Sequence, residues 1–341
     1  MDSKIGRRQV IRAVAAAAVG ASMIGSVAAA PVKMRIAVVP GAYAFLPIFL
    51  AVERGFFAAE GLDLEVMRSS QPQQTLMPML ARGDIDLLPT PFSAAILNAS
   101  KSGFDIKVGG AIAQEREGWN SGTWLVVRNE LYESGRIKTI SDMKGAKLEA
   151  GPAGSQINLA ANMALQKAGL SRTDVHYSTR LTLPEWMPAM INGTVDVLAT
   201  FEPVATQMEK RGLARKLVGF RELAGDLQTL FFVASETHAA KNKESFVKFF
   251  RAYIRAAKLL SDVGGRWTPE LLQLTSKWTN VEAAILQDVP GPLYYGQLGR
   301  IDPASVQHYA TFWKDQGLGS EYKASDLMNS SFIDEAIRQS R

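Results

Sequence analysis

The chain has no cysteine and only three histidines among its 341 residues. The absence of cysteine excludes disulfides, thiolate nucleophiles and metal sites with cysteine ligands. The histidines, His176, His238 and His308, are far apart and show no metal-binding spacing such as H-E-x-x-H. A G-x-S-x-G nucleophile elbow is also absent. We therefore predict a protein that is not an enzyme, with no catalytic residue, no metal and no cofactor.

A strong charge of one sign is missing as well. The formal net charge is +5, of which residues 1–29 contribute +3 through four Lys or Arg and one Asp. The remainder, near +2, has no cluster of Lys and Arg interleaved with aromatic residues. Because a basic patch is the footprint of nucleic-acid binding, we predict no nucleic-acid partner.

Long apolar runs are missing beyond the N-terminus. Gly6 to Arg12 contains paired arginines followed by apolar residues, similar to a twin-arginine export signal. An Ala-rich apolar run and small residues follow, so we predict a signal peptide over residues 1–29, cleaved after Ala28 or Ala29. The alternative is an uncleaved membrane anchor, but a spanning helix needs about 20 apolar residues. Export to the periplasm is the expected outcome.

What the chain does contain is a pattern that occurs twice, 110 positions apart. The first copy is Ala81–Pro91, A-R-G-D-I-D-L-L-P-T-P, and the second is Ile191–Pro203, I-N-G-T-V-D-V-L-A-T-F-E-P. Gly83 and Gly193 suit helix ends, because glycine takes the left-handed conformation without a Cβ clash. The apolar runs that follow each glycine are typical of buried parallel strands.

Thr90 and Thr200 are predicted to lie just past the ends of these strands. Open α/β sheets bind ligands at that edge. Two similar units therefore predict two similar lobes, each contributing a loop to one cleft. The alternative is that any two helix–strand units look alike. Asp86 and Asp196, which start the strands, are predicted to accept backbone hydrogen bonds.

The remaining pattern alternates between strands and helices, as in α/β proteins. A short helix is expected near residue 140 with Ser141 as its N-cap. The run 124–127 is a candidate crossing strand between lobes, and the run 230–234 a candidate return to the first lobe. Further strands are predicted over 34–39, 62–66, 147–150 and 175–178, and helices over 45–54, 75–81, 157–168, 183–191 and from 245 onward.

Several of these phrases resemble the substrate-binding proteins of ABC importers in the sulfonate/nitrate/taurine and thiamine-pyrimidine-precursor group. The most specific is Leu50–Val66, with A-x-E-x-G-F-F-x-x-E-G-L. The others are Leu80–Asp86, Ser141–Gly145, Ala150–Ser155, Asn192–Asp196 and Glu202–Pro203. The resemblance covers residues 34–263, and the rest matches only in being helical.

The resemblance implies a type II periplasmic binding protein, with two lobes that each hold a mostly parallel sheet flanked by helices. Two crossing strands would join lobe I, residues 30–122 and 236–341, to lobe II, residues 123–235. Such a protein is a monomer that closes on a small-molecule solute and docks on an ABC permease in the inner membrane. Enzymes with this fold include a desulfinase with a nucleophilic Cys and a pyrimidine synthase with a cysteine-rich motif. Neither chemistry can run in that form without cysteine.

The predicted ligand site lies on loops at strand ends and on helix N-termini. Gly154, Ser155 and Gln156 open a helix whose N–H groups would favour an oxoanion such as a sulfonate or carboxylate. Alternatively, Ser155 is merely an N-cap. Glu202 either holds a cationic or amide-bearing ligand or caps a helix with Pro203. The other predicted contacts are Gly41, Tyr43, Ser69, Ser70, Gln71, Thr90, Pro91, Phe92, Trp119, Thr200 and Phe201.

Some of these residues have a structural alternative. Tyr43 could serve surface packing, and Phe92 could belong to the core. At the level of the whole protein, two alternatives to solute import remain open. One is an enzyme on the same scaffold, with Glu202 as its only candidate acid or base. The other is a module that presents its ligand to a sensor.

Overall fold

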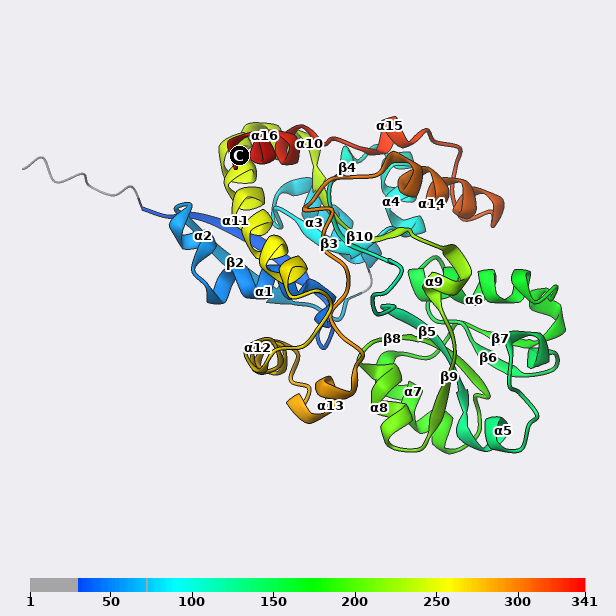
Figure 1. Cartoon of the computed structure of the whole chain (residues 1–341). Coiled ribbons are helices and arrows are strands. Elements are labelled where there is room, and N and C mark those ends of the chain that lie inside the picture. Colours follow the sequence, from blue (N-terminus) through cyan, green and yellow to red (C-terminus); the bar gives the residue numbers. More distant parts are fainter. Residues whose placement is uncertain (1–29, 72, 341) are drawn as a thin grey trace, which may run out of the picture. The chain divides into compact units, whose positions relative to one another are not determined.

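Strands and helices alternate through the part of the chain that the structure, a computed structural model, describes: residues 30–71 and 73–340. The predicted α/β class is confirmed (Figure 1). The predicted export signal lies outside the described residues. Among the described helices, none is long and apolar enough to cross a membrane.

The first sheet is built from strands that precede and follow those of the second sheet in the sequence. β1 and β2 are parallel, and a parallel bridge between Ile36 and Leu87 joins β1 to the residue before β3. β10 lies antiparallel between β3 and β4, giving the order 2-1-3-10-4. The strands are β1 (Val32–Val38), β2 (Leu62–Arg68), β3 (Leu88–Pro91), β4 (Ile106–Gln114) and β10 (Gln228–Ser235).

The second sheet repeats this arrangement with the order 7-6-8-5-9. Its first three strands are parallel, and β5 runs antiparallel between β8 and β9. Each sheet thus has one strand that runs opposite to its neighbours. The prediction was of mostly parallel sheets, and the observed sheets are mixed. The strands are β5 (Thr123–Arg128), β6 (Lys147–Glu149), β7 (His176–Ser178), β8 (Val197–Phe201) and β9 (Ala214–Gly219).

Two short segments carry the chain between the sheets. Residues 115–122 connect β4 to β5, and residues 220–227 connect β9 back to β10. They lie side by side, because the Glu115 N–H donates to the Leu227 carbonyl (2.8 Å) and the Phe220 N–H to Ser121 Oγ (3.1 Å). The run 124–127 was expected to cross, but it belongs to β5 within the second sheet. The return through 230–234 is confirmed, since β10 pairs with β3 and β4.

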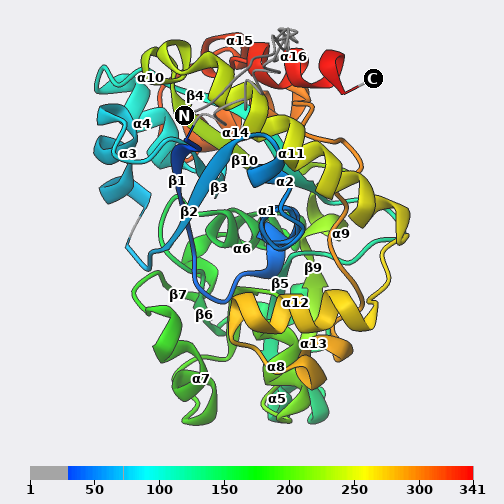
Figure 2. The same cartoon turned by 90° about the vertical axis from the view of Figure 1, so that its left-hand side faces the viewer.

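Helices cover both sheets. Figures 1 and 2 show α11 alongside the first sheet, where it buries Phe249 and Phe250 against Phe232. Around the first sheet lie α1 (Leu46–Glu53), α2 (Phe56–Ala59), α3 (Gln73–Arg82), α4 (Ala94–Lys101), α10 (Glu236–Lys241), α11 (Lys243–Asp262), α12 (Pro269–Thr279), α14 (Pro303–Asp315), α15 (Ala324–Leu327) and α16 (Ser331–Gln339). Around the second lie α5 (Asn129–Glu133), α6 (Gln156–Lys167), α7 (Leu183–Ile191), α8 (Val204–Lys210) and α9 (Phe220–Ala224), with α13 (Ala283–Asp288) against α8.

Two local predictions need correction. Thr90 and Thr200 lie within β3 and β8, not past their ends, because Thr90 pairs with Phe231 and Thr200 with Trp124. Pro89 and Pro91 are compatible with β3. Residues two apart in a strand point their backbone N–H groups to the same edge, so the two donors that proline lacks are both lost from one edge only. The helix near residue 140 is a 3₁₀ turn (η2, Ile140–Met143) capped by Thr139, whose hydroxyl and N–H both donate to Asp142.

The repeated aspartates hold the two sheets in the same way. Asp86 Oδ2 accepts the Arg35 N–H (2.6 Å), and Asp196 Oδ2 accepts the Lys147 N–H (3.0 Å). Each aspartate also donates its own N–H to the carbonyl of the same partner, at 2.9 and 2.8 Å. The predicted backbone hydrogen bonds are therefore confirmed. Each pair joins the start of a repeated strand to its parallel neighbour.

The repeated glycines make room for a neighbouring side chain. Gly83 and Gly193 have φ values of 77° and 70°, which confirms the predicted left-handed helix ends. A Cβ on Gly83 would lie 2.4 Å from the His238 ring, and one on Gly193 would lie 2.6 Å from Arg128. These same side chains reach Asp86 and Asp196. The glycine and aspartate of each repeat therefore hold the amino end of one strand against its parallel neighbour.

Candidate functional site

The N-termini of two helices, one packed on each sheet, meet at the candidate site. The Ala94 N–H at the start of α4 donates to the Gly154 carbonyl (3.1 Å), and a Cβ on Gly154 would lie 3.0 Å from the Ala94 methyl group. Ser155 caps α6 by accepting the Asn158 N–H (3.3 Å), and Gln156 is buried as its first residue. The structure thus brings Ala94, two residues after Phe92, into contact with Gly154.

Tyr43 links the first strand–helix connection to the crossing segment. Its hydroxyl accepts a hydrogen bond from Asn120 Nδ2 (2.8 Å) and donates to the Gly291 carbonyl (3.4 Å). The side chain is fully buried, so the surface-packing alternative is wrong. Burial first, and then the charge of Glu202, raise the pKa of Tyr43 well above its usual value. Tyr43 is therefore held against the crossing segment by its hydrogen bond with Asn120.

Glu115 starts the first crossing segment with a side chain that is only 2% exposed. Its Oε1 accepts the Gly122 N–H (3.1 Å), whereas its Oε2 has no hydrogen-bond partner among the described residues. Burial raises the pKa of Glu115 to about 7. Burial first, and then the charge of Glu115, raise the pKa of Tyr309 on α14 well above its usual value. The hydroxyl of Tyr309 also lacks a partner among the described residues.

Two more unsatisfied acceptors lie at strand ends of the second sheet. Glu149 ends β6; its Oε1 accepts the Gly151 N–H (3.2 Å) and its Oε2 has no partner in the described structure. Thr200 Oγ1, near the end of β8, is likewise buried and unpaired there. Glu149 pairs with Leu198, two residues before Thr200, so both side chains stand on one face of the sheet. This face collects acceptor atoms at the edge where ligands bind in α/β proteins.

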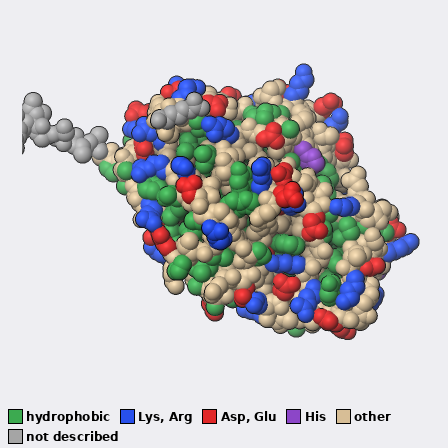
Figure 3. Space-filling view, in the orientation of Figure 1, with side chains coloured by type: hydrophobic (Ala, Val, Ile, Leu, Met, Phe, Trp, Pro, Cys, Tyr) green, Lys and Arg blue, Asp and Glu red, His purple; other side chains and the backbone are tan. Residues whose placement is uncertain are grey.

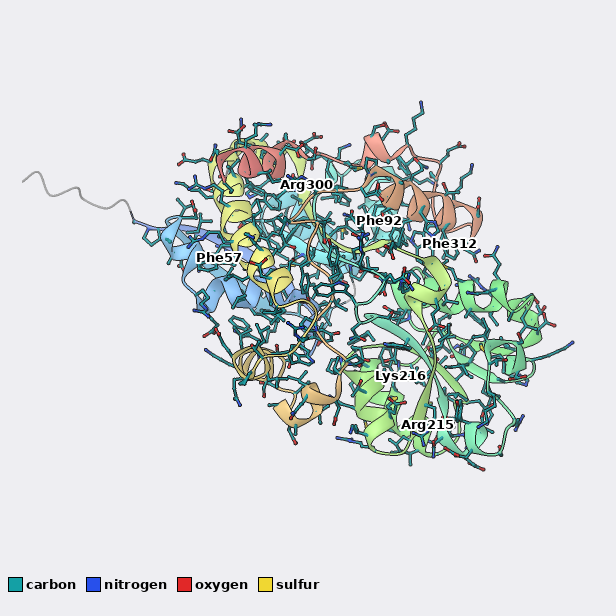
Figure 4. All side chains as sticks on the ribbon, viewed as in Figure 1. Phe57, Phe92, Arg215, Lys216, Arg300 and Phe312 are labelled. Carbon is teal, nitrogen blue, oxygen red and sulfur yellow. The ribbon has the colours of Figure 1, made fainter. Side chains whose placement is uncertain are left out.

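Glu202 is held by partners from its own sheet. Its Oε1 lies 2.6 Å from Lys216 Nζ on β9, and its Oε2 accepts the Thr206 N–H in the first turn of α8 (3.2 Å). The Lys216 ammonium also lies over the Trp124 ring, 4.9 Å from its centroid. The helix-capping alternative for Glu202 is therefore observed. Figure 4 places Lys216 in the second sheet and Phe92 beside the first.

The aromatic candidates lie in packed surroundings. Phe92 is fully buried and stacks on Tyr309 (centroids 5.5 Å apart), so its core alternative is observed. Trp119 packs edge-to-face on Tyr294 (5.1 Å) and against Gly265. Phe201 meets Trp186 edge-to-face at 5.8 Å.

The second predicted loop lies toward solvent. Ser70 and Gln71 are exposed, and Ser69 Oγ accepts the Gln71 N–H (3.2 Å). Gly41, half-buried with φ of 79°, forms the turn before Tyr43. No recorded hydrogen bond joins the described residues Ser69 to Gln71 to the acceptor cluster, so their role as ligand contacts stays a prediction.

Sequence reasoning missed Glu115, Asn120, Glu149 and Tyr309. Glu115 and Asn120 were hidden because β4 was not predicted, since Gly109 and Gly110 interrupt its apolar pattern. Gly110 is needed there because a Cβ would lie 2.8 Å from the Phe250 ring of α11. The available signal was a glutamate two residues after the uncharged run Val108 to Ala113.

Two surface cavities lie away from this cluster. One of about 610 Å³ is lined by Lys147, His176 and Asp196 at the amino ends of parallel strands and by Arg128 at the carboxyl end of β5. One of about 340 Å³ lies between α14 and α15. Acidic and basic side chains are interspersed over the face seen in Figure 3. Within residues 30–71 and 73–340, no group of three or more His, Asp or Glu is arranged to hold a metal.

Comparison with known sequences identifies the family. The sequence profile described as "NMT1/THI5 like" matches residues 43–262, more than half of the chain. The chain belongs to the NMT1/THI5-like family. The resemblance noted in the sequence is thereby confirmed.

Two curated relatives cover part of this NMT1/THI5-like chain. YtlA of Bacillus subtilis (strain 168), named as a binding protein, is 24% identical over 225 residues, or 66% of this chain and 65% of YtlA. A protein of Escherichia coli (strain K12), named as an aliphatic sulfonates-binding protein, is 28% identical over 201 residues, 53% of this chain and 61% of that protein. The chain thus spans less than two thirds of the length of these relatives.

Solved structures show the same fold at low identity. The periplasmic aliphatic sulphonate binding protein SsuA from Escherichia coli has a TM-score of 0.69 at 21% identity, covering 88% of this chain and 92% of SsuA. The periplasmic nitrate-binding protein NrtA from Synechocystis PCC 6803 has a TM-score of 0.71 at 15% identity, covering 91% and 89%. The desulfurization enzyme DszB has a TM-score of 0.65 at 14% identity, covering 91% and 100%. The likeness shows that this chain has the fold of periplasmic binding proteins.

The buried Glu115 predicts a pH-dependent stability. Its pKa is raised from the usual 4.5 to about 7 in the folded state, so the folded protein binds a proton there that the unfolded chain has lost. The resulting stabilisation is complete below about pH 4.5 and lost above about pH 7. It amounts to about 3 kcal/mol at about 1.4 kcal/mol per pKa unit. Urea unfolding between about pH 5 and 8 should show this fall in the wild type and not in Glu115→Gln.

Glu117→Gln is the matched control, because Glu117 lies two residues away with its side chain 83% exposed. It should keep the wild-type pH dependence. Equal pH slopes for the wild type and Glu115→Gln would contradict the assignment.

Proposed function

We propose that this protein is the extracytoplasmic solute-binding component of an ABC importer. Its ligand is a small organic molecule bound between lobe I, residues 30–122 and 236–341, and lobe II, residues 123–235. The supporting observation is the set of buried polar atoms without partners among the described residues, which lie on the crossing segment, on the second sheet and on α14 beside the first sheet. Buried polar atoms are normally satisfied, so such a set is a natural place for ligand hydrogen bonds.

The mechanism needs no covalent step. A ligand that bonds both lobes stabilises the arrangement in which they meet, and the free energy of this differential binding drives closure. The side-by-side segments 115–122 and 220–227 are the natural hinge. The predicted signal peptide, the periplasmic location, the monomeric state and the ABC permease in the inner membrane belong to this proposal.

An enzyme on the same scaffold is the second candidate, because DszB shares the fold. That candidate needs a carboxylate or histidine facing the ligand. Glu202 is engaged with Lys216 and the N-terminus of α8, which argues against its use as an acid or base. A module that hands its ligand to a sensor would use the same binding site and differ only in its partner.

Thermal unfolding with a panel of small organic acids, sulfonates, nitrate, pyrimidines and amines tests the proposal. A true ligand should stabilise the protein by RT ln(1 + [L]/Kd), about 2.7 kcal/mol at a hundredfold excess over Kd. Turnover of a binding compound, measured by mass spectrometry, would favour the enzyme instead. A panel without any stabilising compound would contradict solute binding.

A further inference from the structure

We propose that the site recognises a ligand through a positively charged nitrogen, an ammonium or amidinium group, bound by the buried carboxylate of Glu115. This inference rests on the proposed solute-binding function and names the chemical class of its ligand. It differs from the expectation of an oxoanion as the recognised group.

The first reason is the state of the Glu115 carboxylate. One of its oxygens accepts a backbone N–H from Gly122, and the Ser121 hydroxyl also lowers the pKa of the carboxyl. The other oxygen, Oε2, is buried and makes no hydrogen bond of normal geometry among the described residues. The charge of Arg221 lowers the pKa of Glu115, but the Arg221 guanidinium forms ion pairs with Glu117 and Asp226 instead. A buried carboxylate without an ion-pair partner in contact is costly, and a ligand cation would supply that partner.

The second reason is the composition of the surrounding atoms. The buried atoms without a partner in the described structure that can accept a hydrogen bond include Asn120 Oδ1, Glu149 Oε2, Thr200 Oγ1 and the Tyr309 hydroxyl, and the unpaired donor Trp313 Nε1 lies one turn from Tyr309 on α14. Amide and carboxylate oxygens can only accept hydrogen bonds, and hydroxyls can do so. A group with several N–H donors and a positive charge satisfies such a set, whereas a sulfonate or carboxylate offers only further acceptors.

The third reason is that the cation already present is committed elsewhere. Lys216 lies 2.6 Å from Glu202 Oε1 and also donates to Thr206 Oγ1 (2.9 Å). It neutralises Glu202, and the described structure records no ion pair for Glu115 or Glu149. When Glu115 is ionised, no cation in contact offsets its charge, and this negative charge attracts a cationic ligand group. An anionic group at the far end of the same ligand could still meet the N-terminus of α6.

Pairs of probes that differ only in the nitrogen test the inference. Taurine is compared with isethionate, β-alanine with 3-hydroxypropanoate, and benzylamine with benzyl alcohol, by calorimetry and thermal shift on the full chain. We expect the amino member of at least one pair to bind at least tenfold more tightly. Glu115→Gln should remove that preference, and the exposed control Glu117→Gln should retain it.

A second measurement detects the proton that Glu115 releases when a ligand binds. Because binding of a cation favours ionised Glu115, amine binding near pH 7 should release protons in the wild type and not in Glu115→Gln. Comparing binding heats in two buffers of different ionisation enthalpy measures this release. Should Glu115→Gln fail to fold, Glu149→Gln should still weaken the amino probes selectively.

The outcomes separate the two proposals. If no probe of either kind binds the wild type, solute binding itself fails and this inference falls with it. If hydroxyl probes bind as tightly as their amino counterparts, or if Glu115→Gln weakens both equally, only the cation inference is overturned.

Discussion

Replacing Lys216 by methionine is expected to lower the free energy of unfolding by about 3–5 kcal/mol, the usual cost of leaving one partner of a buried ion pair alone. The Glu202 carboxylate is fully buried, and the Lys216 side chain is 13% exposed. Methionine keeps much of the packing on Trp124, so the loss reports the charge. Urea unfolding of Lys216→Met against the wild type measures it.

The double variant Glu202→Gln with Lys216→Met should recover most of this loss, because no unpaired charge then remains buried. Lys210→Met is the surface control. Lys210 lies 2.8 Å from Asp288 on α13 with its side chain 56% exposed, so its loss should cost less than about 1 kcal/mol. Equal losses for the two lysine variants would show that Glu202 does not depend on Lys216.

Much of the fold could be predicted because its signals are local. Glycines at helix ends, apolar runs and the second copy of the repeat mark the parallel strands and their connections. Helix α7 is observed over its predicted residues, Leu183 to Ile191. The antiparallel strand β10 was also visible as a continuous apolar run.

The strands that were missed carry their information in tertiary contacts. β4 contains two adjacent glycines, which lower strand propensity but are required by the close approach of Phe250. β9 begins Ala214-Arg215-Lys216, and the sequence does not reveal that Lys216 turns inward to a buried glutamate. The extent of β3 depends on pairing with β10, some 140 residues away. Local pattern cannot supply such pairings.

The same limit applies to the candidate site. Loop positions such as Tyr43 and Gly154 were predicted from strand order. Glu115 and Tyr309 become site candidates only because both are buried and each has a polar atom without a partner among the described residues. Glu202 was the predicted charged contact, and only the structure shows that its charge is already neutralised. The sequence locates the edge of the sheet, whereas side-chain partners decide which residues are available to a ligand.

Removing the carboxylate of Asp196 is the second large effect expected. Asp196→Ala should lower the free energy of unfolding by about 3 kcal/mol, since hydrogen bonds to a buried charged group contribute about 1.5–3 kcal/mol each. Asp196, with its side chain 4% exposed, holds the Lys147 N–H (3.0 Å) and Arg128 (3.2 Å). Urea unfolding gives the measurement. Asp84→Ala serves as the control, because Asp84 forms only a surface ion pair with Arg82 in the first repeat.

Asp86→Ala extends the argument to the other sheet, where Asp86 makes the equivalent bond to the Arg35 N–H and also reaches His238 Nε2 (2.6 Å). Its side chain is 15% exposed, so the loss should be smaller than for Asp196. Both aspartates lie at the amino ends of their strands, opposite to Thr200 and Glu149. Ligand affinity of the folded variants should therefore be unchanged while their stability falls. A loss of affinity at unchanged stability would instead mean that the repeated motif serves the ligand and not the sheet.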